Sequence, residues 1–173
     1  MKNRNRSAVF LLLCGCAMAV LAQTAAVKPI EPEIIGQVYL LDSAHQILQK
    51  LPQEQWKAIG KGGWSGAKGF IQVEGAGSSF RLKAGQTIEF VLAVQNVEQV
   101  RLYAAAVKGS NRQAELVQIK NGFGRQQRST SEGISLVITR YGESSFKLVP
   151  DPPLASGEYF IDVEGKLYTF GVD

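Results

Sequence analysis

Few side chains in this sequence have the chemistry of a catalyst. The chain contains one histidine, His45, and its two cysteines are Cys14 and Cys16. A Ser-His-Asp or Cys-His site would need that histidine. Ser43 and Asp42 lie beside it in a predicted turn, and adjacency in a turn is not the geometry of a triad. We therefore expect His45 to be a solvated turn residue and the protein to have no catalytic residue.

Both cysteines lie in a segment that resembles an export signal. Basic residues (Lys2, Arg4 and Arg6) precede an apolar stretch over residues 8–22, which ends in small residues before Gln23. A bilayer crossing needs about 20 apolar residues, so this stretch favours a signal peptide over residues 1–22, cleaved after Ala22. The mature protein would then be periplasmic or extracellular, and it would have no thiol for a disulfide or a zinc site.

A rival interpretation concerns anchoring. Leu13-Cys14-Gly15-Cys16 resembles the lipoprotein signal that places a diacylglycerol on Cys16. Cys14 is unusual two positions before the acceptor, and the apolar run continues to Ala22, so simple cleavage is favoured. Lipidation at Cys16 is the one route by which we expect the protein to be held at a membrane.

The charge balance of the mature chain excludes a strongly basic protein. Without Lys2, Arg4 and Arg6, 16 lysines and arginines face 15 aspartates and glutamates. The basic isoelectric point therefore comes largely from the leader. A near-neutral chain gives no support to nucleic-acid binding through a basic face, and we expect no such partner.

The remaining chain predicts one all-β domain. Residues 23–33 contain Pro29 and Pro32 and favour an extended linker, and residues 34–173 form the single domain. Short apolar alternations separated by turn residues, with no long helical period, predict an antiparallel β-sandwich. The predicted strands are 34–41, 46–51, 70–74, 79–83, 87–94, 99–108, 113–120, 134–141, 145–149, 158–163 and 166–172.

Three segments are predicted to lie outside strands. Residues 52–56 have the pattern of a single helical turn. Residues 60–69 contain five glycines around Trp64 and predict a flexible loop, without the Gly-Lys-Ser/Thr pattern of a phosphate-binding loop. Residues 121–133 are polar and predict a loop that carries Arg125 and Arg128.

The acidic residues show no metal-binding pattern. Glu158, Asp162 and Glu164 have the spacing of a solvated strand face, whereas a calcium cage needs six or more oxygen ligands. We expect no metal and no cofactor. A hydrolase would need distant carboxylates to meet, for instance Glu89 and Glu115. The dispersed acids make this the least favoured function.

One motif supports a particular kind of sandwich. Leu154-Ala155-Ser156-Gly157-Glu158-Tyr159 resembles the corner before a late strand of immunoglobulin-like and fibronectin-like domains, in which the tyrosine hydroxyl ties the turn to the strand. The opening hairpin, the turn at residues 83–86 and the final residues 168–172 are similar to uncharacterised exported bacterial β-sandwich proteins. The resemblance implies an immunoglobulin-like sandwich with an additional N-terminal hairpin, and it implies no function.

These observations favour a non-enzymatic, exported binding or structural module of the cell envelope. The partner is expected to be an envelope protein, and the candidate contact residues are Trp64, Phe123, Arg125 and Arg128, because aromatic and cationic residues on loops are frequent binding anchors. The alternative partner is a glycan. A carbohydrate-binding module would stack sugar rings on Trp56, Trp64 or Tyr141.

Overall fold

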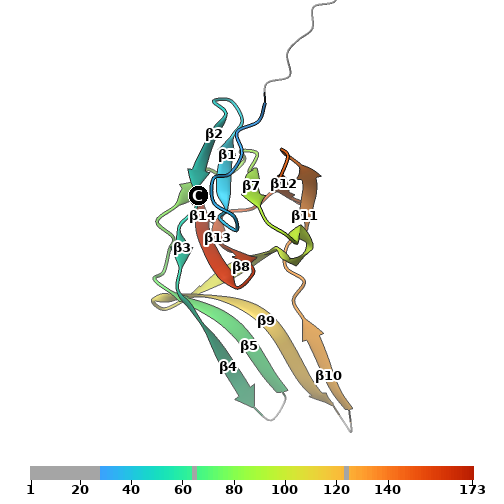
Figure 1. Ribbon diagram of the computed structural model, residues 1–173. Helices are drawn as coiled ribbons and strands as arrows, with labels where there is room; N and C mark the ends of the chain where they lie inside the picture. The colour runs from blue at the N-terminus through green and yellow to red at the C-terminus, as the bar shows by residue number, and fades with distance from the viewer. Residues whose placement is uncertain (1–27, 64–65, 123–124) are drawn as a thin grey trace, which may run out of the picture.

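The computed structural model describes residues 28–63, 66–122 and 125–173, which fold almost entirely into antiparallel strands (Figure 1). The strands form two sheets that pack against each other, as the sequence predicts. The helical structure in the described part of the chain is a single 3-10 turn, Val97–Gln99. No helix among these residues has the length and hydrophobicity to cross a membrane.

The smaller sheet has five strands in the order β11-β12-β7-β1-β2. Its β1–β2 hairpin confirms the predicted pairing, and Asp42 caps the turn by accepting from the N–H groups of Ala44 (3.0 Å) and His45 (3.2 Å). The bounds are β1 Tyr39–Asp42, β2 Ile47–Lys50, β7 Phe90–Ala93, β11 Leu136–Arg140 and β12 Ser145–Pro150.

The larger sheet has nine strands. Seven follow the order β3-β14-β13-β8-β9-β5-β4, with β10 beside β9 and the short β6 beside β14. The bounds are β3 Gln53–Glu54, β4 Trp56–Gly63, β5 Gly66–Glu74, β6 Arg81–Leu82, β8 Arg101–Lys108, β9 Asn111–Gly122, β10 Arg125–Thr130, β13 Gly157–Val163 and β14 Lys166–Val172.

The main core fills the space between the sheets. Alternate residues of β13, namely Tyr159, Ile161 and Val163, point into it together with Phe90 and Phe170, because side chains alternate across a strand. The ring of Phe170 stacks on Tyr159 at 5.4 Å between centroids. The Tyr159 hydroxyl donates to the Ala155 carbonyl oxygen at 2.7 Å. The tie that the resemblance implied between turn and strand is therefore present.

A second core lies on the other side of β13 and β14. It contains Phe160 and Leu167 from these strands, Tyr103 from β8, and Ile71 and Ala114 from β5 and β9. All five residues belong to one sheet, and three strands separate β5 from β14. The larger sheet must therefore curl until its distant strands face each other. The second core is the interior of that curl.

The curl is held by one continuous stretch of chain. Glu54 of β3 pairs with Leu167 of β14, while Trp56 of β4, two residues later, pairs with Val73 of β5. The prediction of a helical turn over residues 52–56 is wrong. The backbone of these residues is extended because each half of the segment completes a different end of the sheet.

Two predicted loops are strands in the structure. The glycine-rich residues 60–69 lie largely in the β4–β5 hairpin, and residues 125–130 form β10 against β9. Glycine weakens a strand on its own, but here it leaves room for a neighbour. A Cβ built on Gly69 would lie 2.7 Å from a Val117 methyl group. Pairing with β9 therefore imposes a strand that local propensity does not predict.

These strands project from the sandwich as an arm. We define the arm as β4, β5, β9 and β10, that is residues 56–63, 66–74, 111–122 and 125–130. In Figure 1 the distal halves of the four strands extend away from the two packed sheets. The base of the arm contributes Ile71, Val73 and Ala114 to the second core. The arm is therefore anchored to the sandwich by apolar packing.

The described end of the expected linker, from Lys28, packs against the sandwich. Glu31 accepts hydrogen bonds from the Ser145 hydroxyl and the Glu143 N–H group, and the Lys28 ammonium lies 3.2 Å from the Glu143 carboxylate. The Gly36 N–H then donates to the Ala93 carbonyl at 2.7 Å. Residues 28–36 thus connect the β11–β12 turn to β7.

We expect this contact to make stability depend on pH. The Ser145 hydroxyl, with the N–H groups of Glu143 and Ser144, holds the pKa of Glu31 below its ordinary value of 4.5, against the opposing effect of desolvation. A lowered pKa stabilises the fold above the unfolded value, and the gain is lost as pH falls through the folded pKa. Thermal unfolding of Glu31→Gln should be less sensitive than wild type to a change from pH 6 to pH 3. Equal sensitivity of the two proteins would contradict this role.

Candidate binding surfaces

Two of the four candidate contact residues, Arg125 and Arg128, lie in the described part of the arm. Trp64 and Phe123 lie outside the described residues. The backbone of Arg125 begins β10, and Arg128 is exposed on the same strand. Because Gly66 pairs with Lys120 of β9, the described ends of the β4–β5 and β9–β10 hairpins lie at the same end of the arm. The structure therefore brings together two chain segments that are about 60 residues apart in sequence.

The arm also gathers lysines that the sequence analysis did not single out. Lys61 of β4 and Lys68 of β5 are directly opposite each other, and Lys68 is opposite Gln118 of β9. Lys120 lies two residues farther along β9, so it shares their face of the sheet. Like charges directly opposite each other destabilise a strand pair. This lysine face is therefore not explained by the stability of the arm.

The lysines are only partly neutralised within the arm. The Lys68 ammonium lies 2.8 Å from the Glu115 carboxylate, and the Lys61 ammonium lies 3.1 Å from the Gln113 amide oxygen and 5.2 Å from the Phe70 ring centroid. Both lysine side chains remain accessible, and Lys120 is exposed. A partner with negative charge can therefore approach them from solvent.

Charge is divided sharply between the arm and the sandwich. The arm contains seven lysines and arginines and two glutamates, a net charge of +5. The rest of the chain after residue 22 contains nine lysines and arginines and 13 aspartates and glutamates, a net charge of −4. The near-neutral total is the sum of these opposite parts. The near-neutral net charge of the whole chain therefore does not reveal this basic surface, which forms only when the strands of the arm pair.

A buried polar network joins the arm to the sandwich. The Arg112 side chain is 1% exposed; its Nη2 donates to Glu54 (2.6 Å) and its Nε to the Gly75 carbonyl (3.0 Å). The Nη1 group lies 3.7 Å from Glu158 and has no hydrogen-bond partner within the described structure. Glu158 also accepts from the Ser78 N–H at 2.9 Å and from Arg81. Arg112 and Glu158 are therefore held inside the protein and are not available to a ligand, whereas Arg81 lies at the surface.

The network corrects one prediction. Glu158, expected on a solvated face, is buried, and Asp162 is half-buried, because the curl of the sheet covers the outer side of β13. Desolvation raises the pKa of Asp162, although its carboxylate accepts from the Gly165 N–H at 3.0 Å. Glu164 is exposed in the turn. Within the described residues, no group of three or more histidine, cysteine or acidic side chains could hold a metal ion.

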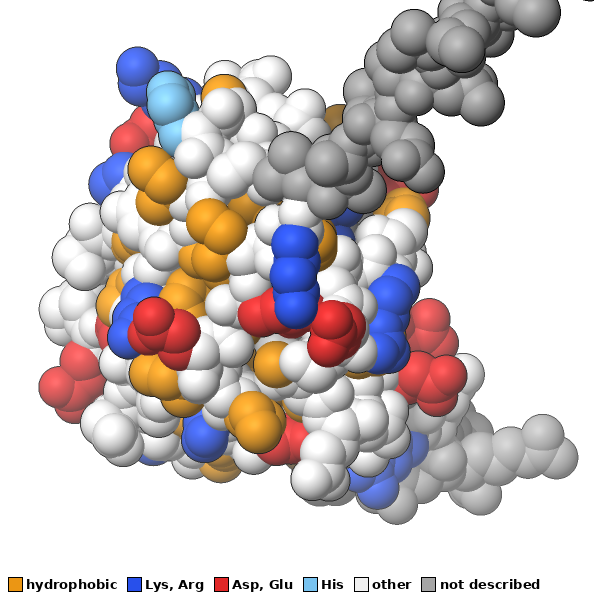
Figure 2. All heavy atoms as spheres, turned by 45° about the horizontal axis from the view of Figure 1, so that its top comes forward, with side chains coloured by type: hydrophobic (Ala, Val, Ile, Leu, Met, Phe, Trp, Pro, Cys, Tyr) orange, Lys and Arg blue, Asp and Glu red, His pale blue; other side chains and the backbone are white. Residues whose placement is uncertain are grey.

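The residues tested for catalysis are far from an active-site arrangement. The His45 side chain is exposed (Figure 2, pale blue), and its Nδ1 lies 2.7 Å from Asp42. The Ser43 hydroxyl donates instead to Glu89. Glu89 also contacts Lys147 in the smaller sheet, whereas Glu115 contacts Lys68 in the larger sheet. Each carboxylate therefore has its own cationic partner on a different sheet.

The aromatic residues proposed for sugar stacking differ in exposure. Trp56 is 40% exposed and lines a groove at the base of the arm. Tyr141 is half-buried, and its hydroxyl is buried without a hydrogen-bond partner. Trp64 is not described. Trp56 is thus the one aromatic of the three for which the structure shows an accessible ring.

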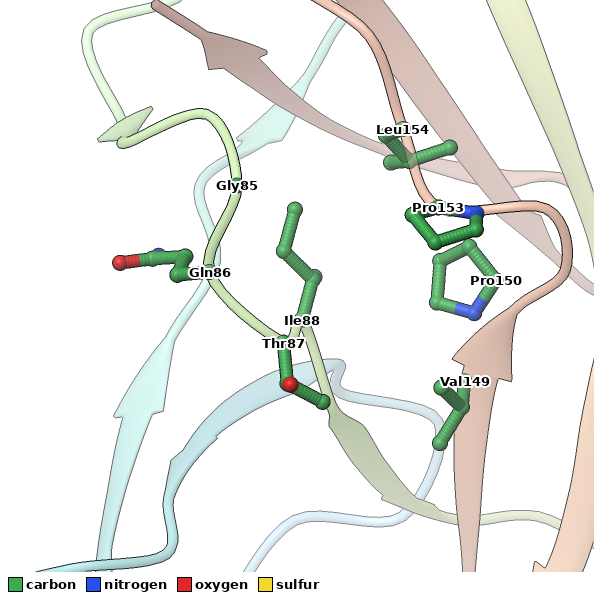
Figure 3. A pocket seen from close by; sticks show the side chains of 8 residues that line it. All are labelled: Gly85, Gln86, Thr87, Ile88, Val149, Pro150, Pro153 and Leu154. Carbon is green, nitrogen blue, oxygen red and sulfur yellow. The ribbon is translucent and has the colours of Figure 1, made fainter.

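A separate pocket of about 160 Å³ lies at one end of the sandwich. Figure 3 shows Ile88, Pro150 and Leu154 directed toward the same small space, while Gln86 points away from it. Ile88 and Leu154 are also part of the main core. The pocket is therefore the open end of the core, and no charged side chain lines it.

Comparison with known proteins identifies no relative. No family model, curated protein or solved structure matches the chain. Among the surfaces described above, the lysine face of the arm is the one whose charge suits a partner.

Proposed function

We propose that the protein is a non-enzymatic binding module of the cell envelope, exported by its leader, and that the arm binds an acidic segment of a partner protein. The charge division carries this proposal: without the buried Arg112 the arm has six lysines and arginines and two glutamates, a net charge of +4, whereas the rest of the chain after residue 22 has a net charge of −4. A basic surface attracts an acidic partner from a distance, and an acidic body repels it elsewhere. The encounter is thereby directed to the arm.

Edge protection does not account for the lysine face. Lysine on an edge strand discourages unwanted strand pairing, and this role is enough to explain the presence of Lys61 on β4. Lys68 and Lys120, however, lie on β5 and β9, and both have a neighbouring strand on each side at these positions. Lysines on interior strands are better explained by a partner that contacts the face of the sheet.

The arm also supplies a strand edge. In the described structure β4 pairs only with β5, so its other edge has free backbone N–H and C=O groups. An extended segment of a partner can add to such an edge by main-chain hydrogen bonds. An acidic segment would place its carboxylates beside Lys57 and Lys61, which lie on the same face of β4.

Crosslinking in the native envelope tests the proposal. A photoreactive amino acid at Gln118, within the lysine face, should yield a defined protein adduct, and one at Gln49, on the exposed surface of β2, should not. The adduct should disappear in Lys61→Ala/Lys68→Ala/Lys120→Ala. It should persist in Lys50→Ala/Lys83→Ala/Lys166→Ala, which removes the same charge from exposed sites on the sandwich.

Binding to defined probes separates an acidic protein from a lipid surface. Wild type should bind poly-L-glutamate with an affinity that falls as salt rises, and the arm triple variant should lose most of this affinity while the sandwich triple variant keeps it. Equal losses in the two variants would refute the role of the arm. Arm-dependent binding to phosphatidylglycerol vesicles without binding to poly-L-glutamate would replace the protein partner by a membrane.

A further inference from the structure

The free edge of β11, at one side of the smaller sheet, is open and apolar. Within the described residues β11 pairs only with β12, and Figure 1 shows no strand beyond it. Three β-branched residues follow one another along the strand, and two of them, Val137 and Ile138, are 48% and 38% exposed. An exposed apolar edge is a template on which another strand can pair.

The other free edges of comparable length carry charge. In the described structure β2, β4 and β10 each have a single neighbouring strand. Lys50 of β2, Lys57 and Lys61 of β4 and Arg128 of β10 are exposed. Charged side chains on an edge strand discourage pairing with another chain. These three edges are therefore protected in a way that the middle of β11 is not.

The one charged residue of β11 is turned away from the edge. The Arg140 guanidinium donates to the Gly142 carbonyl oxygen at 3.0 Å and to the Glu143 carbonyl oxygen, both in the β11–β12 turn. It also lies 5.3 Å from the ring centroid of Phe146, the residue opposite Arg140 on β12. Arg140 is thus held against its own hairpin.

The free backbone groups of β11 belong to its even-numbered residues. At one end of the strand the Ser135 carbonyl accepts from the Asp151 N–H, and at the other end the Tyr141 N–H donates to the Ser145 carbonyl, both at 3.0 Å. In an antiparallel ladder, residues that exchange hydrogen bonds with one neighbour alternate with residues that do not. The odd-numbered residues therefore bond to β12, and the even-numbered residues direct their N–H and C=O groups to the open edge.

We propose that β11 pairs antiparallel with β11 of a second copy of this chain, about a two-fold axis at Ile138. In this register Ile138 lies opposite its own counterpart and Leu136 lies opposite Arg140. All the even-numbered residues of the strand then exchange hydrogen bonds across the axis. A register centred on Val137 would instead set Arg140 opposite Ile134, whose N–H already donates to the Leu102 carbonyl oxygen at 2.6 Å.

The charge pattern favours a second copy as the occupant. Pairing β11 with itself brings together the uncharged residues 136–139 of both copies, whereas pairing it with β2, β4 or β10 would add a strand that carries lysine or arginine. Cross-strand contacts would form on both faces, with Ile138 beside its counterpart and Val137 beside Thr139. A two-fold contact uses the same edge on both copies, so it closes at a dimer. The dimer does not depend on the proposed function of the arm.

Sedimentation equilibrium of the purified protein tests the association. Wild type should be a dimer in equilibrium with its monomer. Ile138→Lys places like charges beside each other at the axis and should raise the dimer dissociation constant about a hundredfold or more. Gln49→Lys adds the same charge to the edge strand β2 and should leave the constant unchanged. Circular dichroism will show that both variants are folded.

Disulfide formation tests the register. In protein carrying Cys14→Ser/Cys16→Ser, Ile138→Cys sets two thiols directly opposite each other, with Cα atoms about 5.5 Å apart, which a disulfide can span. Mild oxidation should link most of this variant into dimers, and Val137→Cys, which faces Thr139, should link far less. The proposal is overturned if wild type is monomeric at every concentration, if folded Ile138→Lys associates as wild type does, or if Val137→Cys links as readily as Ile138→Cys.

Discussion

Replacing Arg112 by methionine is expected to lower the free energy of unfolding by about 3–5 kcal/mol, as when one partner of a buried ion pair is removed. Methionine fills part of the same space but leaves Glu54 without its 2.6 Å partner and leaves Glu158 with Arg81 alone of its two cationic neighbours. It also removes the guanidinium that lies 5.8 Å from the Phe160 ring centroid. Urea unfolding at pH 7 measures the loss.

An exposed arginine of the same sheet supplies the control. Arg128→Met should change stability by no more than about 0.5 kcal/mol, as is usual for a surface substitution. Arg112→Met/Glu54→Gln should recover part of the loss, because the amide can remain buried at lower cost than an unpaired carboxylate. If Arg112→Met were no more harmful than Arg128→Met, the network would not be a stabilising junction.

Phe160→Ala is expected to have an effect of similar size, about 3–5 kcal/mol, since it deletes a fully buried aromatic side chain. The ring lies in the second core, but its neighbours Tyr159 and Ile161 on the same strand lie in the main core. The loss should therefore appear as one cooperative transition at lower urea. Phe160→Leu, which keeps most of the apolar volume, should cost less than about 1.5 kcal/mol.

Hydrogen exchange measures whether the two cores unfold together. If Phe160→Ala abolished protection only in β5 and β9 and left β7 and β12 protected, the arm would unfold separately from the sandwich. The shared strand β13 argues against that result, because a strand that supplies side chains to both cores cannot be released from one without disturbing the other.

The sequence predicts those strands whose side chains alternate. Residues 158–163 and 166–172 match β13 and β14 closely because their interior residues are large and apolar. The same alternation wrongly predicts that Glu158 is exposed to solvent. A strand pattern assigns residues to two faces but does not show whether another part of the sheet covers the outer face, and here β5 and β9 curl over it.

The arm is where prediction from sequence fails, for two physical reasons. Glycine has no side chain to give a strand its periodic pattern, so β4 and β5 have the composition of a loop. The pairing of β5 with β9 uses the space that Gly69 leaves for Val117. The lysine face combines Lys61, Lys68 and Lys120, which are scattered in the sequence. Arg128, which the sequence singles out nearby, pairs with Ile119 and therefore lies on the opposite face of the sheet.

The separation of charge between arm and sandwich gives the molecule an electric dipole directed along the arm. In the field of an anionic partner a dipole experiences a torque as well as an attraction, so the protein should rotate before it makes contact. Collisions that would otherwise occur at random orientations would then occur arm first. A protein whose total charge is close to zero can in this way still be oriented toward an anionic partner.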